Sequence, residues 1–147
     1  MFSFIDRLIA KLSGDLDSKL SSEAQYAFVR TNIINATNGT GKAILITSSC
    51  ISQDMLSVIC KELVSSFNDI GLEAVYGDSF ASMENGYRFV AATGVQKNAR
   101  AVEIARFADG AILVEEKGRS LYPKIEHCKA QLADVGCKII GCILYDG

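Results

Sequence analysis

The chain has 147 residues, a formal net charge of −2, and 49% hydrophobic against 22% charged residues. This length suits one domain with a proper core. The slight acidity argues against a nucleic-acid binder, which normally carries a basic face. No stretch reaches the roughly 18 consecutive apolar residues that a membrane span needs. We therefore expect a single globular domain that binds no nucleic acid.

The pattern of residues 1–13 predicts an amphipathic helix. Asp6, Arg7 and Lys11 interrupt its apolar residues, so it does not resemble a signal peptide. Such a helix packs on its own domain or in a dimer, enters a partner's groove, or lies in a membrane interface. Two basic residues weaken the last alternative. The apolar face consists of Met1, Phe2, Phe4, Ile5, Leu8, Ile9 and Leu12.

Helical patterns and short apolar runs alternate through the rest of the chain, so we treat residues 1–14 as an N-terminal helix and 15–147 as one domain. Such alternation predicts an α/β fold with a parallel sheet and helices on both faces. In that architecture ligands bind at the carboxyl ends of the strands. The expected strands cover 42–47, 73–76, 87–92, 110–115 and 138–144, and the expected helices 22–36, 53–69, 97–107 and 121–135.

Five cysteines are present, an odd number, and no pair has the spacing of a zinc knuckle or a redox motif. Buried thiols in a reducing cytoplasm are the simplest interpretation. His127 has no companion at metal-site spacing and is interpreted as a helix-surface residue. The sequence therefore predicts no metal site. The cysteines are Cys50, Cys60, Cys128, Cys137 and Cys142.

Four segments carry a family resemblance in the correct order. The first holds Glu23, Tyr26, Val29, Arg30, Thr31, Asn32 and Ile33. The others are Ile44-Leu-Ile-Thr-Ser-Ser49, Ala108-Asp-Gly-Ala-Ile-Leu-Val114 and Val135-Gly-Cys-Lys-Ile-Ile-Gly-Cys-Ile-Leu144. Together they resemble the cytoplasmic bacterial tyrosine kinases of the CpsD/CapB type, which act in capsule and exopolysaccharide production within the MinD-like P-loop group. The resemblance covers about residues 21–144.

This resemblance implies a Rossmann-like, P-loop-type, doubly wound sheet of five parallel strands in the order 2-3-1-4-5. In that family the helix before the first strand helps protomers associate, and the cytoplasmic tail of a membrane partner docks on the kinase. The interface candidates implied here are Glu23, Tyr26 and Arg30. The apolar stripe of Phe2, Phe4, Ile5, Leu8, Ile9 and Leu12 could supply a second contact.

The loop after the first strand departs from the family at the residues that bind phosphate. There the family continues with Pro-Gly-Glu-Gly-Lys-Ser/Thr. The glycines let backbone amides point at the phosphates, the lysine neutralises them, and the hydroxyl holds magnesium. In this chain Met55 stands in place of the lysine and Leu56 in place of the first hydroxyl. The degenerate loop comprises Ser49, Cys50, Ile51, Ser52, Gln53, Asp54, Met55 and Leu56.

Two further sites of the family are also altered. Of the Asp-x-Asp pair after the second strand, Asp78 remains and Phe80 replaces the second acid. After the third strand Ala92 replaces the magnesium-linked aspartate, and only Thr93 survives. The segment between these two strands is also much shorter than in the family.

We therefore expect a cofactor-free pseudoenzyme that regulates or scaffolds capsular or exopolysaccharide biosynthesis. The implied partner is a polysaccharide co-polymerase or export membrane protein, a kinase paralogue, or a second copy of the chain. The implied location is the cytoplasm, with weak or indirect attachment to the inner face of the membrane through residues 1–13.

Two alternatives stay open. One is a ligand-binding or enzymatic site rebuilt at the carboxyl edge of the sheet, although no nucleophile–base pair or metal set suggests a reaction. The other is a decaying copy that folds but does little. The residues of a rebuilt site would be Thr47, Ser49, Asp54, Asp78 and Thr93.

Overall fold

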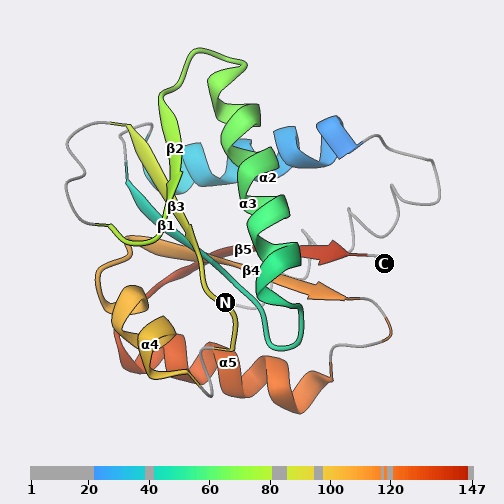
Figure 1. Cartoon of the computed structure of the whole chain (residues 1–147), viewed down its shortest axis with the longest axis vertical. Coiled ribbons are helices and arrows are strands. Elements are labelled where there is room, and N and C mark those ends of the chain that lie inside the picture. The colour runs from blue at the N-terminus through green and yellow to red at the C-terminus, as the bar shows by residue number, and fades with distance from the viewer. Residues whose placement is uncertain are drawn as a thin grey trace.

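The computed structural model describes residues 22–38, 42–80, 86–94, 98–116, 118 and 121–145 (Figure 1). The expected helix over residues 1–13, with its stripe of Phe2, Phe4, Ile5, Leu8, Ile9 and Leu12, lies outside the described residues. It stays a prediction, as does the division of the chain at residue 14.

Helices and strands alternate in the order that the sequence predicts. The elements are α2 (Ser22–Ala36), β1 (Ala43–Thr47), α3 (Gln53–Asn68), β2 (Ala74–Gly77), β3 (Tyr87–Ala91), α4 (Ala99–Arg106), β4 (Gly110–Glu116), α5 (Tyr122–Asp134) and β5 (Ile139–Tyr145). The ends differ from the predicted ones by one or two residues, as is usual for segments identified by periodicity alone. The α/β prediction is confirmed.

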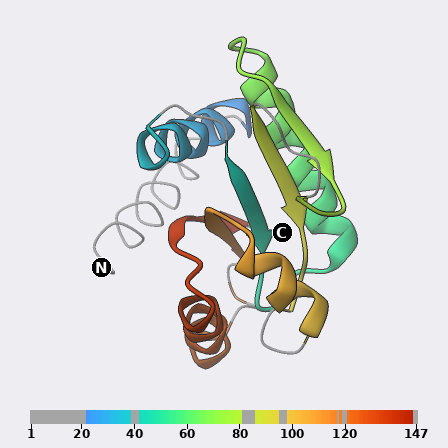
Figure 2. The same ribbon diagram turned by 90° about the vertical axis from the view of Figure 1, so that its left-hand side faces the viewer.

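The strands form one parallel sheet in the order β2-β3-β1-β4-β5, which confirms the predicted order. Helices α2 and α3 cover one face, here called the front face, and α4 and α5 cover the other, the back face (Figures 1 and 2). Right-handed crossovers produce this division, because the chain moves toward one edge through α3 and toward the opposite edge through α4 and α5.

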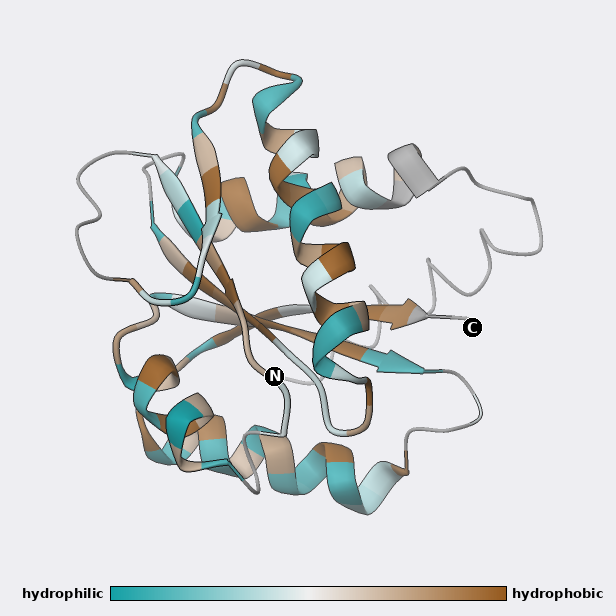
Figure 3. Ribbon diagram, viewed as in Figure 1, coloured by the Kyte–Doolittle hydropathy of each residue, from teal (hydrophilic) through white to brown (hydrophobic). Residues whose placement is uncertain are grey.

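Each strand contributes to two hydrophobic clusters because successive side chains point to opposite faces. On β1, Ile44 and Ile46 join the front cluster with Phe67, whereas Leu45 joins the back cluster with Val90. Figure 3 shows the hydrophobic residues concentrated on the central strands. Burial of each such side chain contributes about 1.5–3 kcal/mol. The continuous apolar runs in the sequence are thus explained by burial on both sides.

Strand β2 forms an edge of the sheet, and its outer side is partly occupied. The side-chain amide of Asn68 donates to the carbonyl of Ala74 at 3.2 Å and accepts from the amide of Ala74 at 3.1 Å. The amide of Tyr87 bonds Glu73 on the inner side, so the groups of Ala74 face outward. Asn68 therefore takes the place of a neighbouring strand at this position, which limits pairing of the edge with another chain.

The connection from β2 to β3 covers only residues 78–86. A helical crossover between parallel strands usually needs a dozen or more residues. On the back face of β2, Val75 remains 41% exposed. In the part of the chain that the structure describes, no helix is long and apolar enough to cross a membrane.

Candidate functional site

The loop between β1 and α3 lies at the carboxyl edge of the sheet, where the sequence predicts the degenerate phosphate loop. The hydroxyl of Ser48 accepts from the amides of Cys50 at 3.1 Å and Ile51 at 2.9 Å. Cys50 is half-buried, and Ile51 is buried in the front cluster. Two amides of the loop are therefore already bonded inside the protein and do not point at a ligand.

A carboxylate from β4 fills the space that this loop encloses. Glu115 is 2% exposed, and its Oε1 accepts from the hydroxyl of Ser49 at 2.7 Å and from that of Ser48 at 3.3 Å. The amide of Ser49 lies 3.3 Å from Oε1 and 3.2 Å from Oε2. A buried acid is tolerated only where such donors surround it. The loop thus binds an anion that belongs to the chain itself.

Sequence reasoning did not identify Glu115. Its position follows from the parallel register of β1 and β4, in which Thr47 lies opposite Leu113. Two residues beyond that pair, Glu115 comes beside the loop that starts at Ser48. The only signal in the sequence is an acid that directly follows the apolar run ending at Val114.

The third strand closes the loop from the other side. The side chain of Gln53 donates to the carbonyl of Ala91 at 2.7 Å and accepts from the amide of Thr93 at 3.1 Å. The hydroxyl of Thr93 donates to the carbonyl of Ile51 at 2.6 Å. Thr93, predicted to be a remnant of the active site, therefore holds the loop against the end of β3.

At the start of α3, side chains cap the helix or pack against the core. Ser52 caps the helix by accepting from the amide of Met55 at 3.3 Å. Asp54 is exposed in the first turn, where its negative charge interacts favourably with the helix dipole. Met55 is half-buried against the front cluster, and Leu56 lies within that cluster with no exposed surface.

The remaining predicted positions separate into two groups. Ala92 is buried in the back cluster beside the end of β3. Asp78 and Phe80 line a groove against α4, away from the loop's hydrogen bonds. The structure thus joins Ser49 and Thr93 to the loop, whereas Asp78 lines a different cavity. Thr47 is fully buried, and its hydroxyl has no hydrogen-bond partner among the described residues.

Two of the interface candidates on α2 contact α3. The guanidinium of Arg30 donates to the carbonyl of Ser66 at 2.7 Å and to its hydroxyl at 2.9 Å. Burial, together with a hydrogen bond to Glu62, raises the pKa of Tyr26 far above its usual value of 10.0. Both side chains line an open cavity of about 540 Å³ between the two helices. Residue Glu23 lies in α2, and its side chain is outside the described part.

The cysteines, all of which lie in the described residues, form no disulfide. Burial raises the pKa values of four thiols from 9.0, to about 12 for Cys60, Cys128 and Cys142 and to about 11 for Cys137. Such thiols are poor nucleophiles at neutral pH. Within the described residues, no three His, Cys, Asp or Glu side chains group closely enough to hold a metal ion.

No protein-family model matches the chain, and no curated protein matches it. Solved structures do share its fold. The crystal structure of the chimerical protein CapA2B2 superimposes with a TM-score of 0.69 at 12% identity, over 85% of each chain. The fold is that of bacterial tyrosine-kinase domains. Another solved structure, the BceF tyrosine kinase domain, gives a TM-score of 0.61 at 10% identity, over 84% of this chain and 75% of the kinase domain.

At these identities the similarity concerns the fold alone. It agrees with the fold that the sequence resemblance implies.

Proposed function

We propose that this chain is a pseudoenzyme: a tyrosine-kinase-like domain that has lost nucleotide chemistry and acts by binding other proteins. The observation that carries the proposal is the buried carboxylate of Glu115 inside the loop after β1. Its oxygens lie within hydrogen-bond distance of the amide and hydroxyl of Ser49. An incoming phosphate would need the donors that Glu115 already occupies.

Electrostatics and packing both support this proposal. A triphosphate placed at the loop would meet a negative charge where a phosphate loop offers glycine amides and a lysine. Met55 contributes no positive charge, and Leu56 cannot hold magnesium because it is a core side chain. The carboxylate that would be linked to magnesium at position 92 is an alanine. These three losses at one edge leave no ordinary route to phosphoryl transfer.

The proposed role is regulation or scaffolding in capsular or exopolysaccharide biosynthesis. The family resemblance and the kinase-like fold support this setting. The proposed partner is the cytoplasmic part of a polysaccharide co-polymerase or export protein, or a kinase paralogue. We place the protein in the cytoplasm, with any membrane attachment made through that partner or through residues 1–13.

Titration calorimetry with ATP and magnesium tests the loss of nucleotide binding. We expect no heat of binding and no shift of the unfolding temperature. A ligand present at 100 times its dissociation constant would stabilise the folded state by about 2.7 kcal/mol, so a thermal scan is a sensitive second measurement. Magnesium-dependent binding with micromolar affinity would refute the pseudoenzyme proposal.

Deletion of the coding gene tests the proposed role separately. We expect a changed amount or chain length of the surface polysaccharide, restored by the natural chain and by a variant with Asp54→Asn, an exposed position of the loop, because the loop has no catalytic task. Unchanged polysaccharide would contradict the regulatory role while leaving the lost nucleotide binding untouched.

A further inference from the structure

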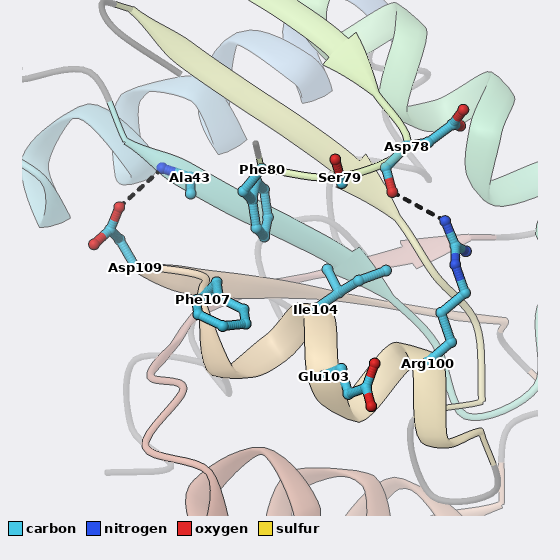
Figure 4. Close-up of a pocket in the computed structure, with 9 residues that line it drawn as sticks. All are labelled: Ala43, Asp78, Ser79, Phe80, Arg100, Glu103, Ile104, Phe107 and Asp109. Atoms are coloured by element: carbon cyan, nitrogen blue, oxygen red, sulfur yellow. Dashed lines mark hydrogen bonds between the residues drawn. The ribbon is translucent and has the colours of Figure 1, made fainter. Parts of the chain in front are cut away.

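A groove of about 690 Å³ runs along α4 on the back face of the sheet. In Figure 4 the side chains of Phe80, Ile104 and Phe107 point toward one another across it. Phe107 is 75% exposed, an unusual state for a large aromatic side chain at the end of a helix. The centre of the groove is therefore apolar and open to solvent.

Charged side chains surround this apolar floor, and most of them are acidic. The lining residues include Asp78, Glu103 and Asp109, of which Asp109 accepts from the amide of Ala43 at 2.9 Å, and one cation, Arg100. Arg100 donates to the backbone carbonyl of Asp78 at 3.0 Å. Arg88 lies outside the lining, against Gly77, where an added side chain would collide with it. The balance of charge around the groove is thus negative.

The position of the groove indicates what shape would fill it. If a helix connected β2 to β3 by a right-handed crossover, it would lie on the back face, beside α4. In this chain the connection has only residues 78–86, and Val75 on the same face of β2 stays 41% exposed. Strand addition at the neighbouring edge is hindered, because Asn68 already bonds both backbone groups of Ala74.

We propose that this groove binds an amphipathic helix of a partner protein whose polar face is basic. The inference rests on the proposed function, since it assumes that the chain acts by binding another polypeptide. Apolar side chains at helical spacing would pack against Phe80, Ile104 and Phe107. Lysine or arginine side chains beside them would reach the carboxylates of Asp78 and Glu103 at the rim, where charge complementarity selects the partner.

The test uses the full chain and a fluorescent 14-residue peptide, acetylated and amidated, with leucine and phenylalanine on one helical face and lysine on the other. A matched acidic peptide carries glutamate at every lysine position. Fluorescence anisotropy should show that the basic peptide binds and the acidic one binds at least about tenfold more weakly. Phe107→Ser and Glu103→Lys should each weaken binding of the basic peptide about tenfold.

Two control variants lie away from the groove. Val58→Ser removes an apolar side chain that is 50% exposed on α3, and Asp134→Lys reverses an exposed charge at the end of α5. Both should leave the affinity within about twofold. Equal losses in control and groove variants would show non-specific attraction and overturn the proposal, as would equal binding of both peptides or binding of neither.

Two further measurements show whether another occupant fills the groove and which of the two proposals fails. Self-association that Phe107→Ser abolishes would make a second copy of the chain the occupant, which also overturns the proposal. Calorimetry with ATP and magnesium on the same preparation distinguishes failure of the groove proposal from failure of the proposed function. Absent peptide binding with absent ATP binding refutes only the groove proposal, whereas ATP binding refutes the proposed function.

Discussion

Replacing Glu115 by alanine should destabilise the protein, because the loop after β1 would lose the acceptor around which it is built. Glu115 is 2% exposed, and its carboxylate accepts from the amide of Ser49 and from the hydroxyls of Ser48 and Ser49. The hydroxyls can rotate toward other acceptors or water. The amide cannot, and a buried donor left without a partner costs about 1–3 kcal/mol.

The loss of the Cγ methylene group of Glu115 adds about 0.8 kcal/mol. The expected decrease in the free energy of unfolding is therefore about 3 kcal/mol. For a chain of this size, that change lowers the unfolding temperature by about 6–12 °C. Glu115→Gln keeps the volume and one acceptor oxygen, so we expect a smaller loss of about 1–2 kcal/mol.

Urea unfolding followed by far-ultraviolet circular dichroism measures these differences. The matched control is Glu103→Ala, which removes an exposed glutamate from α4 and should change stability by less than about 0.5 kcal/mol. If Glu115→Ala is as stable as this control, the carboxylate does not organise the loop. The account of how an internal anion replaced phosphate would then be wrong.

Two other predictions concern backbone strain and the buried thiols. Gly86→Ala should lower the free energy of unfolding by about 2–3 kcal/mol, because φ is +76° and the new Cβ would lie 2.6 Å from the carbonyl oxygen of Glu73. Gly71→Ala, with φ of +80° and no atom within 4 Å of the new Cβ, should lower it by only about 1 kcal/mol. Equal losses for the two variants in urea unfolding would refute the steric argument. Burial raises the pKa of Cys60, Cys128 and Cys142 from 9.0 to about 12, so their contribution to stability is complete below pH 9 and decreases as the pH rises toward 12. In that window each buried thiol should lower the free energy of unfolding by up to about 1.4 kcal/mol per pH unit. A free energy of unfolding that stays constant between pH 8 and about pH 10 would contradict the burial of these thiols.

The alternation of helices and strands was predictable from sequence because burial on both faces requires continuous apolar runs. Ile44, Leu45 and Ile46 illustrate this, since all three are fully buried although they face different helices. The strand order came from the family resemblance. The helix predicted for residues 1–13 lies outside the described residues and stays a prediction.

The candidate site was predictable only in part. Met55 and Leu56 are interpretable from sequence, since a phosphate loop cannot work without its lysine and hydroxyl. The α2 candidates show the limit of this reasoning. Arg30 matches a family motif linked to association, yet in the structure its guanidinium bonds Ser66 of the same chain. A strict monomer in light scattering would contradict a role of α2 in self-association.

The sequence by itself determined that positions 55, 56, 80 and 92 differ from the nucleotide-site residues of the family that it resembles, because chemical identity is a local property. What replaced them was decided by tertiary structure. Glu115 and Ser49 are 66 positions apart along the chain, and they meet only because β1 and β4 pair in parallel. The groove beside Phe107 likewise depends on tertiary structure, because it brings Asp78 and Phe80, which follow β2, against α4. Contacts between distant segments depend on register and crossover handedness, and neither is encoded in any single stretch of residues.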